Sequence, residues 1–320
     1  MPAGAAPRRA DGRAATQASS TVLGSPNRVR NQTLRALPRS VTETSVAIRL
    51  MQIRGAAAIG VAAAQALADH VQGLPGRPAT VLAAARKAAR TLDAARPTAV
   101  ALHNALGWVL AAMADGSSAA GMKEDASAAA RRLAAAVASS RAAIAGHGAG
   151  LLRDGAVVLT HCHSSTVVAV LAEAHRQGKR LQVIATETRP FRQGLRTVAA
   201  LDALAIPSTL IVDSAVEHVL ATRPVDAVLV GADTVARDGS LFNKVGTAGV
   251  ARLAKAHGVP VHSAAGLHKF SRREPGLVVV EERDANEIVA AGEVPPGVRV
   301  FNPVFARTEP ARLTSYITET

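Results

Sequence analysis

Residues 156–265 alternate short β-rich apolar runs with amphipathic helical stretches. The runs are AVVLT (156–160), LQVIAT (181–186), TLIVD (209–213), AVLVGAD (227–233) and VPVHSAA (259–265). Helical spacing of apolar residues follows between them at 166–179, 193–205 and 243–258. Strands that alternate with helices at this spacing are typical of βαβ units in a parallel, doubly wound sheet. We therefore predict a Rossmann-like domain over residues 149–320.

The preceding part of the chain has a purely helical pattern. Ala-rich stretches carry Leu, Val and Ile at three- and four-residue spacing, and Gly and Pro interrupt them at 73–78, 96–98 and 114–118. This pattern predicts four or five helices in an N-terminal helical domain over residues 31–148. The Gly-rich stretch GHGAG (146–150) is interpreted as a hinge. The predicted fold class is α/β, with a helical domain followed by a Rossmann-like doubly wound parallel sheet.

The positive charge of the chain is concentrated at its start. The formal net charge is +13, and residues 1–40 hold seven arginines and one aspartate. Because residues 1–30 are low in bulky apolar residues and lack periodicity, we predict a disordered basic tail there. An Arg-, Ser- and Ala-rich start also resembles an organelle transit peptide, an alternative that stays open. The remaining charge suits an anionic small substrate as easily as a nucleic acid.

Composition argues against several partners and compartments. Aromatic residues make up 2% of the chain, which disfavours nucleic-acid binding by base stacking. The apolar runs are too short for a membrane span, and a single cysteine suits a reducing cytosol. We expect a cytoplasmic protein with no nucleic-acid or membrane partner. The first run is not followed by GxGxxG, and a Walker A lysine motif is absent, so the fold alone supports neither NAD nor ATP.

Ligands of doubly wound sheets bind beyond the carboxyl ends of the strands, where HCHSS, TETRP, DSA and GADTV lie in this sequence. Strand alternation predicts that Cys162 points away from His161 and His163. Ser164 and Ser165 are candidate N-caps of the next helix. A thiol before a helix N-terminus has a lowered pKa, and the N–H groups there bind phosphate.

Three interpretations of Cys162 stay open: a buried structural cysteine, a zinc ligand and a catalytic thiolate. Zinc is disfavoured because a strand would place the ligands of HCH on two faces. Asp233 follows a predicted strand among small residues, where it serves as a site carboxylate or caps a turn. Asn243 and Lys244 are predicted to begin a helix, and Lys269 follows the last strand; both lysines fall on the predicted ligand side.

Two further candidates lie in the helical part. Arg54 and Gly55 precede an Ala-rich helix whose small residues permit close approach of the backbone. Arg96 carries a guanidinium that can bind phosphate with two parallel hydrogen bonds.

Together these segments resemble a known superfamily. IRGAAAIG, RPTAV, THCHSSTV, TETRPFRQG, DSA, GADTV, FNKVGT and HKF occur in the order and at about the spacing of the sugar-phosphate isomerases. That superfamily includes methylthioribose-1-phosphate isomerases, archaeal ribose-1,5-bisphosphate isomerases and the α, β and δ subunits of the eukaryotic initiation exchange factor. The resemblance covers residues 31–317. It is strongest to the ribose-1,5-bisphosphate isomerases, because HCHSS stands where methylthioribose enzymes typically have HCNAG.

The resemblance implies an aldose–ketose isomerase that converts ribose 1,5-bisphosphate to ribulose 1,5-bisphosphate. It makes Cys162 the proton acceptor and Asp233 the proton donor. The substrate contacts that it implies are Arg54, Gly55, Ala56, Ala57, Arg96, Ser164, Ser165, Thr166, Asn243, Lys244 and Lys269. It further implies no metal and no cofactor, AMP as an activator, and a homo-oligomer in which dimers assemble into hexamers.

The chemistry sets requirements on these two groups. The substrate ring is closed, so an acid must protonate the ring oxygen while a base removes the C2 proton. Asp233 then needs a raised pKa, and Cys162 needs a lowered one. A hydride shift from C2 to C1 stays open as the other route.

Two other functions of the superfamily are alternatives. One is methylthioribose-1-phosphate isomerisation. The other is a non-catalytic regulatory role, although regulatory subunits generally lack the Cys and Asp that this chain has. The chain also departs from the superfamily near its C-terminus, where NPVFARTEP places Ala306 at the aspartate position of NPxFDxTP. We expect C-terminal packing or a subunit contact to differ there.

Overall fold

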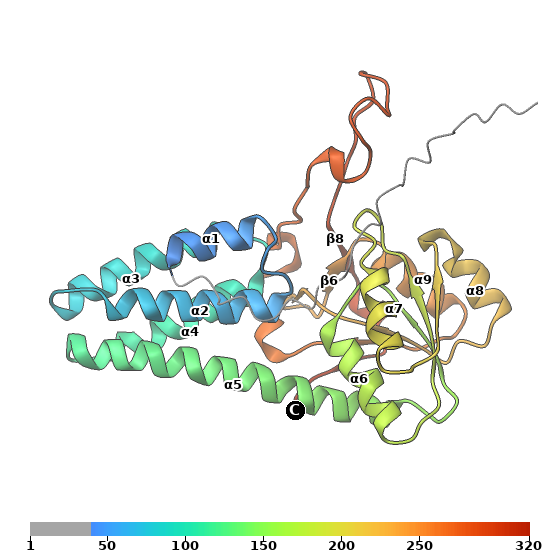
Figure 1. The fold of residues 1–320 in the computed structure, drawn as a ribbon, viewed down its shortest axis with the longest axis horizontal. Coiled ribbons are helices and arrows are strands. Elements are labelled where there is room, and N and C mark those ends of the chain that lie inside the picture. The colour runs from blue at the N-terminus through green and yellow to red at the C-terminus, as the bar shows by residue number, and fades with distance from the viewer. Residues whose placement is uncertain (1–39) are drawn as a thin grey trace, which may run out of the picture. The chain divides into compact units, whose positions relative to one another are not determined.

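Residues 40–320 are described by a computed structural model of the chain. The predicted basic tail, residues 1–30, lies outside these residues. The first half of the described chain is helical, as the sequence predicts, with breaks at the three Gly- and Pro-containing segments (Figure 1). Its helices are α1 (Val41–Arg49), α2 (Ala56–Gln72), α3 (Pro78–Asp93), α4 (Val100–Ala114) and α5 (Ala119–Leu151).

Local sequence signals explain where these helices begin. Ser40 and Glu43 form a capping box at the start of α1, in which each side chain binds the other residue's backbone N–H. Pro78 occupies the first turn of α3, where its missing N–H costs nothing. Ser118 caps α5 by accepting the N–H of Gly121 at 3.0 Å. The apolar faces of the five helices enclose one core.

The predicted hinge at GHGAG is wrong, because α5 runs through it without a break to Leu151. Only one of its glycines is needed for packing. A Cβ at Gly148 would lie 2.7 Å from both γ-carbons of Val170 in helix α6 (Ser165–Arg176), whereas a Cβ at Gly146 or Gly150 would meet no atom within 4 Å. Glycine here permits the close approach of two helices rather than bending of the chain.

The second half contains the predicted parallel sheet. Its strands are β1 (Val157–Thr160), β2 (Gln182–Thr186), β3 (Ser208–Ile211), β4 (Ala227–Val230), β7 (Val261–Ala264) and β9 (Ser315–Ile317). They lie in the order β3-β2-β1-β4-β7-β9, and every pairing is parallel. Order 3-2-1-4 with crossover helices is the doubly wound arrangement, so the predicted fold class is confirmed.

Helices cover both faces of this sheet. One face packs against the end of α5, α6 (Ser165–Arg176) and α7 (Gly194–Asp202). The other face packs against α8 (Val216–Thr222) and α9 (Thr247–Ala256). Each face has its own apolar cluster, so β1 and β4 are buried from both sides, as near-continuous Val and Leu runs require. Within residues 40–320, no helix has both the length and the hydropathy needed to cross a membrane.

A small antiparallel sheet was not predicted from the sequence. It consists of β5 (Thr234–Val235), β6 (Leu241–Lys244) and β8 (Phe305–Thr308). The prediction that Asn243 and Lys244 begin a helix is therefore wrong, because they end β6 and α9 begins only at Thr247. Their partners in β8 are Ala306 and Phe305, more than 60 residues later, so no local pattern reports the pairing.

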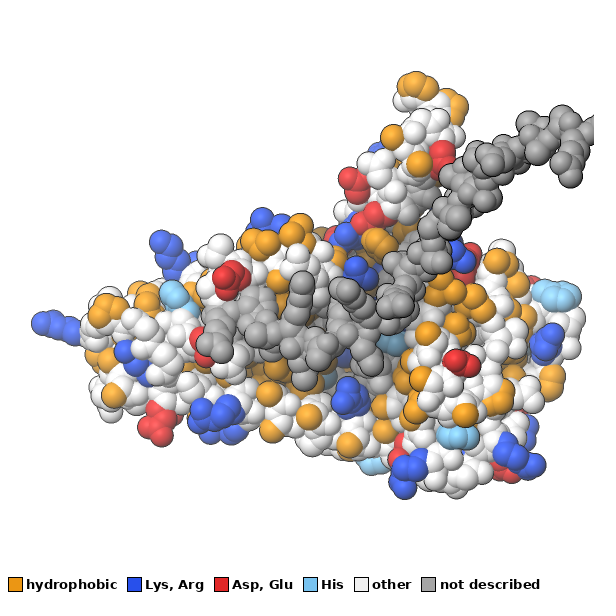
Figure 2. Space-filling view, viewed as in Figure 1, with side chains coloured by type: hydrophobic (Ala, Val, Ile, Leu, Met, Phe, Trp, Pro, Cys, Tyr) orange, Lys and Arg blue, Asp and Glu red, His pale blue; other side chains and the backbone are white. Residues whose placement is uncertain are grey.

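Residues 271–303 form a segment that we call the arm. Figure 1 shows it in orange, extending away from the strands. It contains the short 3-10 turns Pro275–Leu277 and Ala285–Glu287 and an isolated antiparallel bridge between Glu282 and Pro303. Figure 2 shows apolar side chains on this extension. Its exposed large apolar residues are Leu277, Val279, Val280, Val298 and Phe301.

Candidate active site

Cys162 lies in a sharp turn beyond β1. Because β1 ends at Thr160, the strand alternation predicted around Cys162 does not apply. Its φ is +70°, in the left-handed region, which costs a non-glycine residue roughly 1–2 kcal/mol. Its N–H donates to Oγ1 of Thr188 at 2.9 Å, and its carbonyl accepts from Oγ1 of Thr197 at 3.0 Å. Both polar backbone groups of the residue are thus held by threonine hydroxyls.

The histidine on the N-terminal side of Cys162 is structural. His161 is buried, with Nδ1 2.7 Å from Oγ1 of Thr186 and Nε2 2.8 Å from the carbonyl of Val245. A carbonyl can only accept, so Nε2 carries the proton and Nδ1 accepts from the Thr186 hydroxyl. Burial lowers the pKa of His161 and keeps the ring neutral.

His163, on the C-terminal side of Cys162, also makes a side-chain hydrogen bond. Its Nδ1 lies 3.1 Å from Oγ1 of Thr197. That hydroxyl gives its one proton to the Cys162 carbonyl, so Nδ1 of His163 donates to it. Burial lowers the pKa of His163 to about 4. Over the described range 40–320, the side chains form no group of three or more His, Cys, Asp and Glu suited to a metal ion.

Burial, rather than the helix N-terminus, has the largest effect on the pKa of the Cys162 thiol. It raises the pKa of Cys162 to about 11, although the positive charges of Lys244 and Arg196 lower it. The negative charge of Asp233 raises it further. The expectation of a lowered pKa for Cys162 is therefore wrong. Desolvation of the thiolate outweighs the nearby cations.

Asp233 follows β4 at the carboxyl edge of the sheet, as predicted. It is half-buried, and its N–H donates to the carbonyl of Phe242 at 3.1 Å. Its charge acts on three predicted site residues: Cys162 and the buried Lys244 and Lys269. Burial lowers the pKa of both lysines, and the carboxylate opposes that effect. The structure thus brings together one thiol, one carboxylate and two desolvated ammonium groups.

Lys269 reaches this group on a loop that the helical half supports. The 3-10 turn Leu267–Lys269 follows β7 and packs against α2 and α4. From α4, the Asn104 amide donates to the carbonyls of His268 and Phe270, each at 3.0 Å. These two hydrogen bonds bracket Lys269 and fix its backbone.

Arg96 joins the same group from the helical half. Its guanidinium lies 5.7 Å from the ring centre of Phe305, and Nζ of Lys244 lies 5.2 Å from that centre. Both cations therefore pack against one aromatic ring. Nε of Arg96 lies 3.5 Å from Oε2 of Glu281 in the arm but makes no hydrogen bond, although it is buried. A half-buried guanidinium whose buried Nε makes no hydrogen bond is suited to an anion.

The start of α6 lies beside Asp233. Ser164 is the N-cap, as predicted, and accepts the N–H of Val167 at 3.4 Å. Ser165 and Thr166 form the first turn, where free N–H groups favour an anion. A Cβ at Gly231, two residues before Asp233, would lie 2.7 Å from Oγ of Ser164. The glycine of GAD is what permits this close approach.

Asn243 is buried in β6 and donates from Nδ2 to Oγ1 of Thr247 at 3.0 Å. Ala306 lies directly opposite it in β8. Paired residues in an antiparallel sheet share a face, so the superfamily's aspartate would stand beside this amide. With alanine there, Thr247 is the hydrogen-bond partner of Asn243.

The other predicted contacts lie between α1 and α2. Gly55 is the N-cap of α2 with φ +91°, which favours glycine, and Ala56 and Ala57 begin the helix. Arg54 is exposed, and its Nε donates to the carbonyl of Met51 at 2.7 Å. Within residues 40–320 its guanidinium makes no hydrogen bond or ion pair to the group around Cys162.

Sequence reasoning missed the residues that hold the Cys162 turn. Thr188 and Thr197 bind its backbone, and Asp213 accepts the N–H groups of Thr188 at 2.8 Å and Arg189 at 2.7 Å. The segments TETRP and DSA were recognised as strand-end segments, but no individual residue in them was assigned a role. The position of these segments, beyond the ends of β2 and β3, was the sequence signal that could have identified Thr188 and Asp213.

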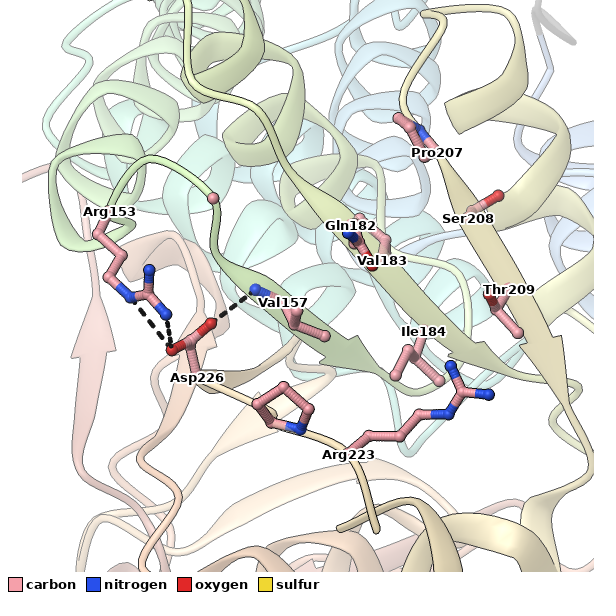
Figure 3. Close-up of a pocket in the computed structure, with 12 residues that line it drawn as sticks. Arg153, Val157, Gln182, Val183, Ile184, Pro207, Ser208, Thr209, Arg223 and Asp226 are labelled. Carbon is pink, nitrogen blue, oxygen red and sulfur yellow. Dashed lines mark hydrogen bonds and ion pairs between the residues drawn. The ribbon is translucent and has the colours of Figure 1, made fainter.

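A cavity of about 470 Å³ opens elsewhere, where Val157 and Gln182 begin their strands (Figure 3). Figure 3 shows Arg153 at its rim, paired with Asp226 at 2.7 Å. This is the amino end of the sheet, opposite to Cys162, so the cavity is not part of the candidate active site.

Comparison with known proteins supports the resemblance. The chain is 40% identical over 281 residues to a ribose 1,5-bisphosphate isomerase of Archaeoglobus fulgidus, covering 87% of this chain and 88% of that protein. It is 38% identical to a methylthioribose-1-phosphate isomerase of Heliobacterium modesticaldum, covering 85% and 84%. The crystal structure of the translation initiation factor eIF-2B, subunit delta, from A. fulgidus superposes with a TM-score of 0.70 at 36% identity, covering 88% and 87%.

The matched region includes both the helical half and the sheet. Residues 52–320 match the sequence profile of the initiation factor 2 subunit family, from the loop before α2 to the last residue. The superfamily resemblance seen in the motifs is therefore confirmed, and the chain belongs to the initiation factor 2 subunit family.

Proposed function

We propose that this protein is an aldose–ketose isomerase that converts ribose 1,5-bisphosphate to ribulose 1,5-bisphosphate. One observation carries the proposal: Cys162 and Asp233 lie within electrostatic range of each other and of the buried Lys244, and Asp233 also lies within range of the buried Lys269. A proton acceptor, a proton donor and cations for phosphate are what this reaction requires. A relative with that activity in its name is 40% identical over most of the chain.

In the proposed mechanism, Asp233 gives a proton to the ring oxygen and the C1–O bond of the ring breaks. Cys162 removes the C2 proton, which gives an enol phosphate. That proton then returns from Cys162 to C1 while the C2 hydroxyl gives its proton to the Asp233 carboxylate, so the ketose forms and both groups regain their starting states. The charges of Lys244 and Arg196 stabilise the thiolate. Since burial keeps the thiol protonated at neutral pH, turnover is expected to rise as the pH increases from 7 toward 9.

The cations favour a bisphosphate over a thioether substrate. Methylthioribose 1-phosphate has a neutral methylthio group where ribose 1,5-bisphosphate has a phosphate. Each hydrogen bond to a charged group contributes about 1.5–3 kcal/mol. Losing two of them costs roughly 3–6 kcal/mol, or about 10²- to 10⁴-fold in kcat/KM. Arg96 and Lys244, packed on one ring, are the groups that a thioether would leave unpaired.

The test is kcat/KM for both substrates, with product identified by phosphorus NMR. We expect ribose 1,5-bisphosphate to be preferred by at least about 100-fold. A ratio near one, or a preference for the thioether, favours the second candidate, methylthioribose-1-phosphate isomerisation, which the 38% identical relative supports. Absence of turnover with either substrate favours a regulatory role.

We further propose that the enzyme forms a homo-oligomer, in which dimers assemble into hexamers, and that AMP activates it. The exposed apolar residues of the arm support self-association, because they leave several large apolar side chains in contact with water. Sedimentation velocity at several protein concentrations tests the assembly. Turnover with and without AMP tests the activation.

A further inference from the structure

Two buried threonines hold the backbone of Cys162. Its φ of +70° is a conformation that glycine adopts readily, but a glycine has no thiol. Thr188, beyond β2, accepts the Cys162 N–H at 2.9 Å, and Thr197, in α7, donates to the Cys162 carbonyl at 3.0 Å. Both side chains are buried, so water cannot replace either hydrogen bond.

Thr188 is itself held in an unusual conformation. Its φ is +61°, which is a genuine outlier for a β-branched residue. Asp213 secures it by accepting its N–H at 2.8 Å, and its Oγ1 lies 3.1 Å from Oγ1 of Thr186. Two strained residues are thus joined by a hydrogen bond beside the candidate base. Strain of this kind persists only where the surroundings over-determine it, and it concentrates at functional sites.

We propose that Thr188 and Thr197 are positioning residues that hold Cys162 in its left-handed turn and so aim its thiol at the substrate. The inference rests on the isomerase function proposed above, because it assigns these threonines to the same base. Neither residue needs to touch the substrate. Each acts through the backbone of Cys162.

We call the two hydrogen bonds that join Thr188 and Thr197 to the Cys162 backbone the clamp. By fixing the backbone, the clamp determines which charged groups lie near the thiol. The groups that act on it electrostatically come from three elements: Lys244 at the end of β6, Asp233 beyond β4, and Arg196 in α7, with the backbone of His163 next to it. If Cys162 relaxed to a negative φ, its Cβ would turn and the sulfur would leave this arrangement. A displacement of about 1 Å in a reacting group costs up to 10²-fold in rate.

The kinetic test uses matched pairs of variants. Thr188→Val and Thr197→Val keep the side-chain shape and remove the hydroxyl, whereas Thr188→Ser and Thr197→Ser retain it. We expect each valine variant to lose roughly 10- to 100-fold in kcat with KM changed less than about threefold, and each serine variant to keep most of its turnover. The control is Thr308→Val, whose buried Oγ1 has no hydrogen-bond partner in the described part of the chain; it should retain wild-type kcat.

Alkylation of the thiol tests the clamp without any substrate. Cys162 is the only cysteine of the sequence, so the iodoacetamide reaction of the folded protein reports this group alone. We expect the pH midpoint of alkylation to fall in the valine variants, as the freed thiol leaves its buried position, and to stay at the wild-type value in the serine variants and Thr308→Val.

The two readouts separate this inference from the proposed function. If the wild-type protein isomerises neither substrate, the proposed function fails, while a shifted alkylation midpoint still demonstrates the clamp. Valine variants with wild-type alkylation profiles overturn the inference, even if their kcat falls. So do serine variants that are as impaired as the valine ones.

Discussion

The three glycines of GHGAG should respond in opposite directions to replacement by alanine. Gly146 and Gly150 are exposed on α5, and a Cβ there would meet no other atom within 4 Å. Alanine is favoured over glycine inside a helix by about 0.5–1 kcal/mol. We therefore expect Gly146→Ala and Gly150→Ala each to raise the free energy of unfolding by that amount.

Gly148→Ala should instead destabilise the protein. The new Cβ would lie 2.7 Å from both γ-carbons of Val170, which is fully buried. Rotation of the valine about χ1 can move only one of the two methyl groups away, so the helices must separate. Overpacking of this kind costs about 1–3 kcal/mol. Subtracting the helix-propensity gain leaves a net loss of up to about 2.5 kcal/mol, so Gly148→Ala should be about 1–3 kcal/mol less stable than the two control variants.

The assay is urea denaturation followed by circular dichroism, with the three variants compared in one buffer. Gly146→Ala and Gly150→Ala are the matched controls, because they make the same chemical change two residues away on the same helix. The reasoning is refuted if Gly148→Ala is as stable as these controls. A loss of stability in all three variants would restore the hinge interpretation.

Three other expectations follow from the site. Cys162→Ser should lose at least about 100-fold in kcat with the fold intact, because a serine hydroxyl is a far weaker acid than a thiol; turnover above a tenth of the wild-type rate contradicts the base role. Asp233→Asn should lower kcat and leave KM nearly unchanged, since the amide cannot give a proton, and normal kcat would move the acid role to another group. Burial lowers the pKa of His163 and His268 from 6.5 to about 4, so the unfolded chain binds more protons in this window. The free energy of unfolding should therefore decrease as the pH falls from 6.5 to 4.5, and a urea midpoint that increases over this range would contradict it.

The sequence predicted what local patterns encode. The five apolar runs coincide with β1, β2, β3, β4 and β7. Strands inside the sheet are buried on both faces and need continuous Val and Leu, whereas the edge strand β3 is largely exposed. Asp233 and the Cys162 turn lie at the strand ends where the topology rule places ligands. These features depend on neighbours in sequence and on the general geometry of a parallel sheet.

Features that depend on distant residues were not predictable. Asn243 and Lys244 were assigned to a helix because their strand partners lie more than 60 residues away in β8. The hydroxyls that hold Cys162 belong to residues 26 and 35 positions later. The raised thiol pKa has the same origin, since burial is a property of the assembled fold and outweighs the local signal of the helix N-terminus.

The continuity of α5 has a mechanical consequence. Its 33 residues extend about 50 Å at 1.5 Å per residue. Met122 and Ala126 belong to the core of the helical bundle, whereas Ile144 and Ala149 belong to the core beneath the parallel sheet. The helix therefore connects the helical bundle and the parallel sheet rigidly, because it is part of the core of each. Rotation of the helical bundle relative to the sheet would have to bend α5 or remove it from one of the two cores in which it packs. Substrate entry is thus expected to rely on displacement of peripheral segments such as the arm, which holds Arg96 through Glu281.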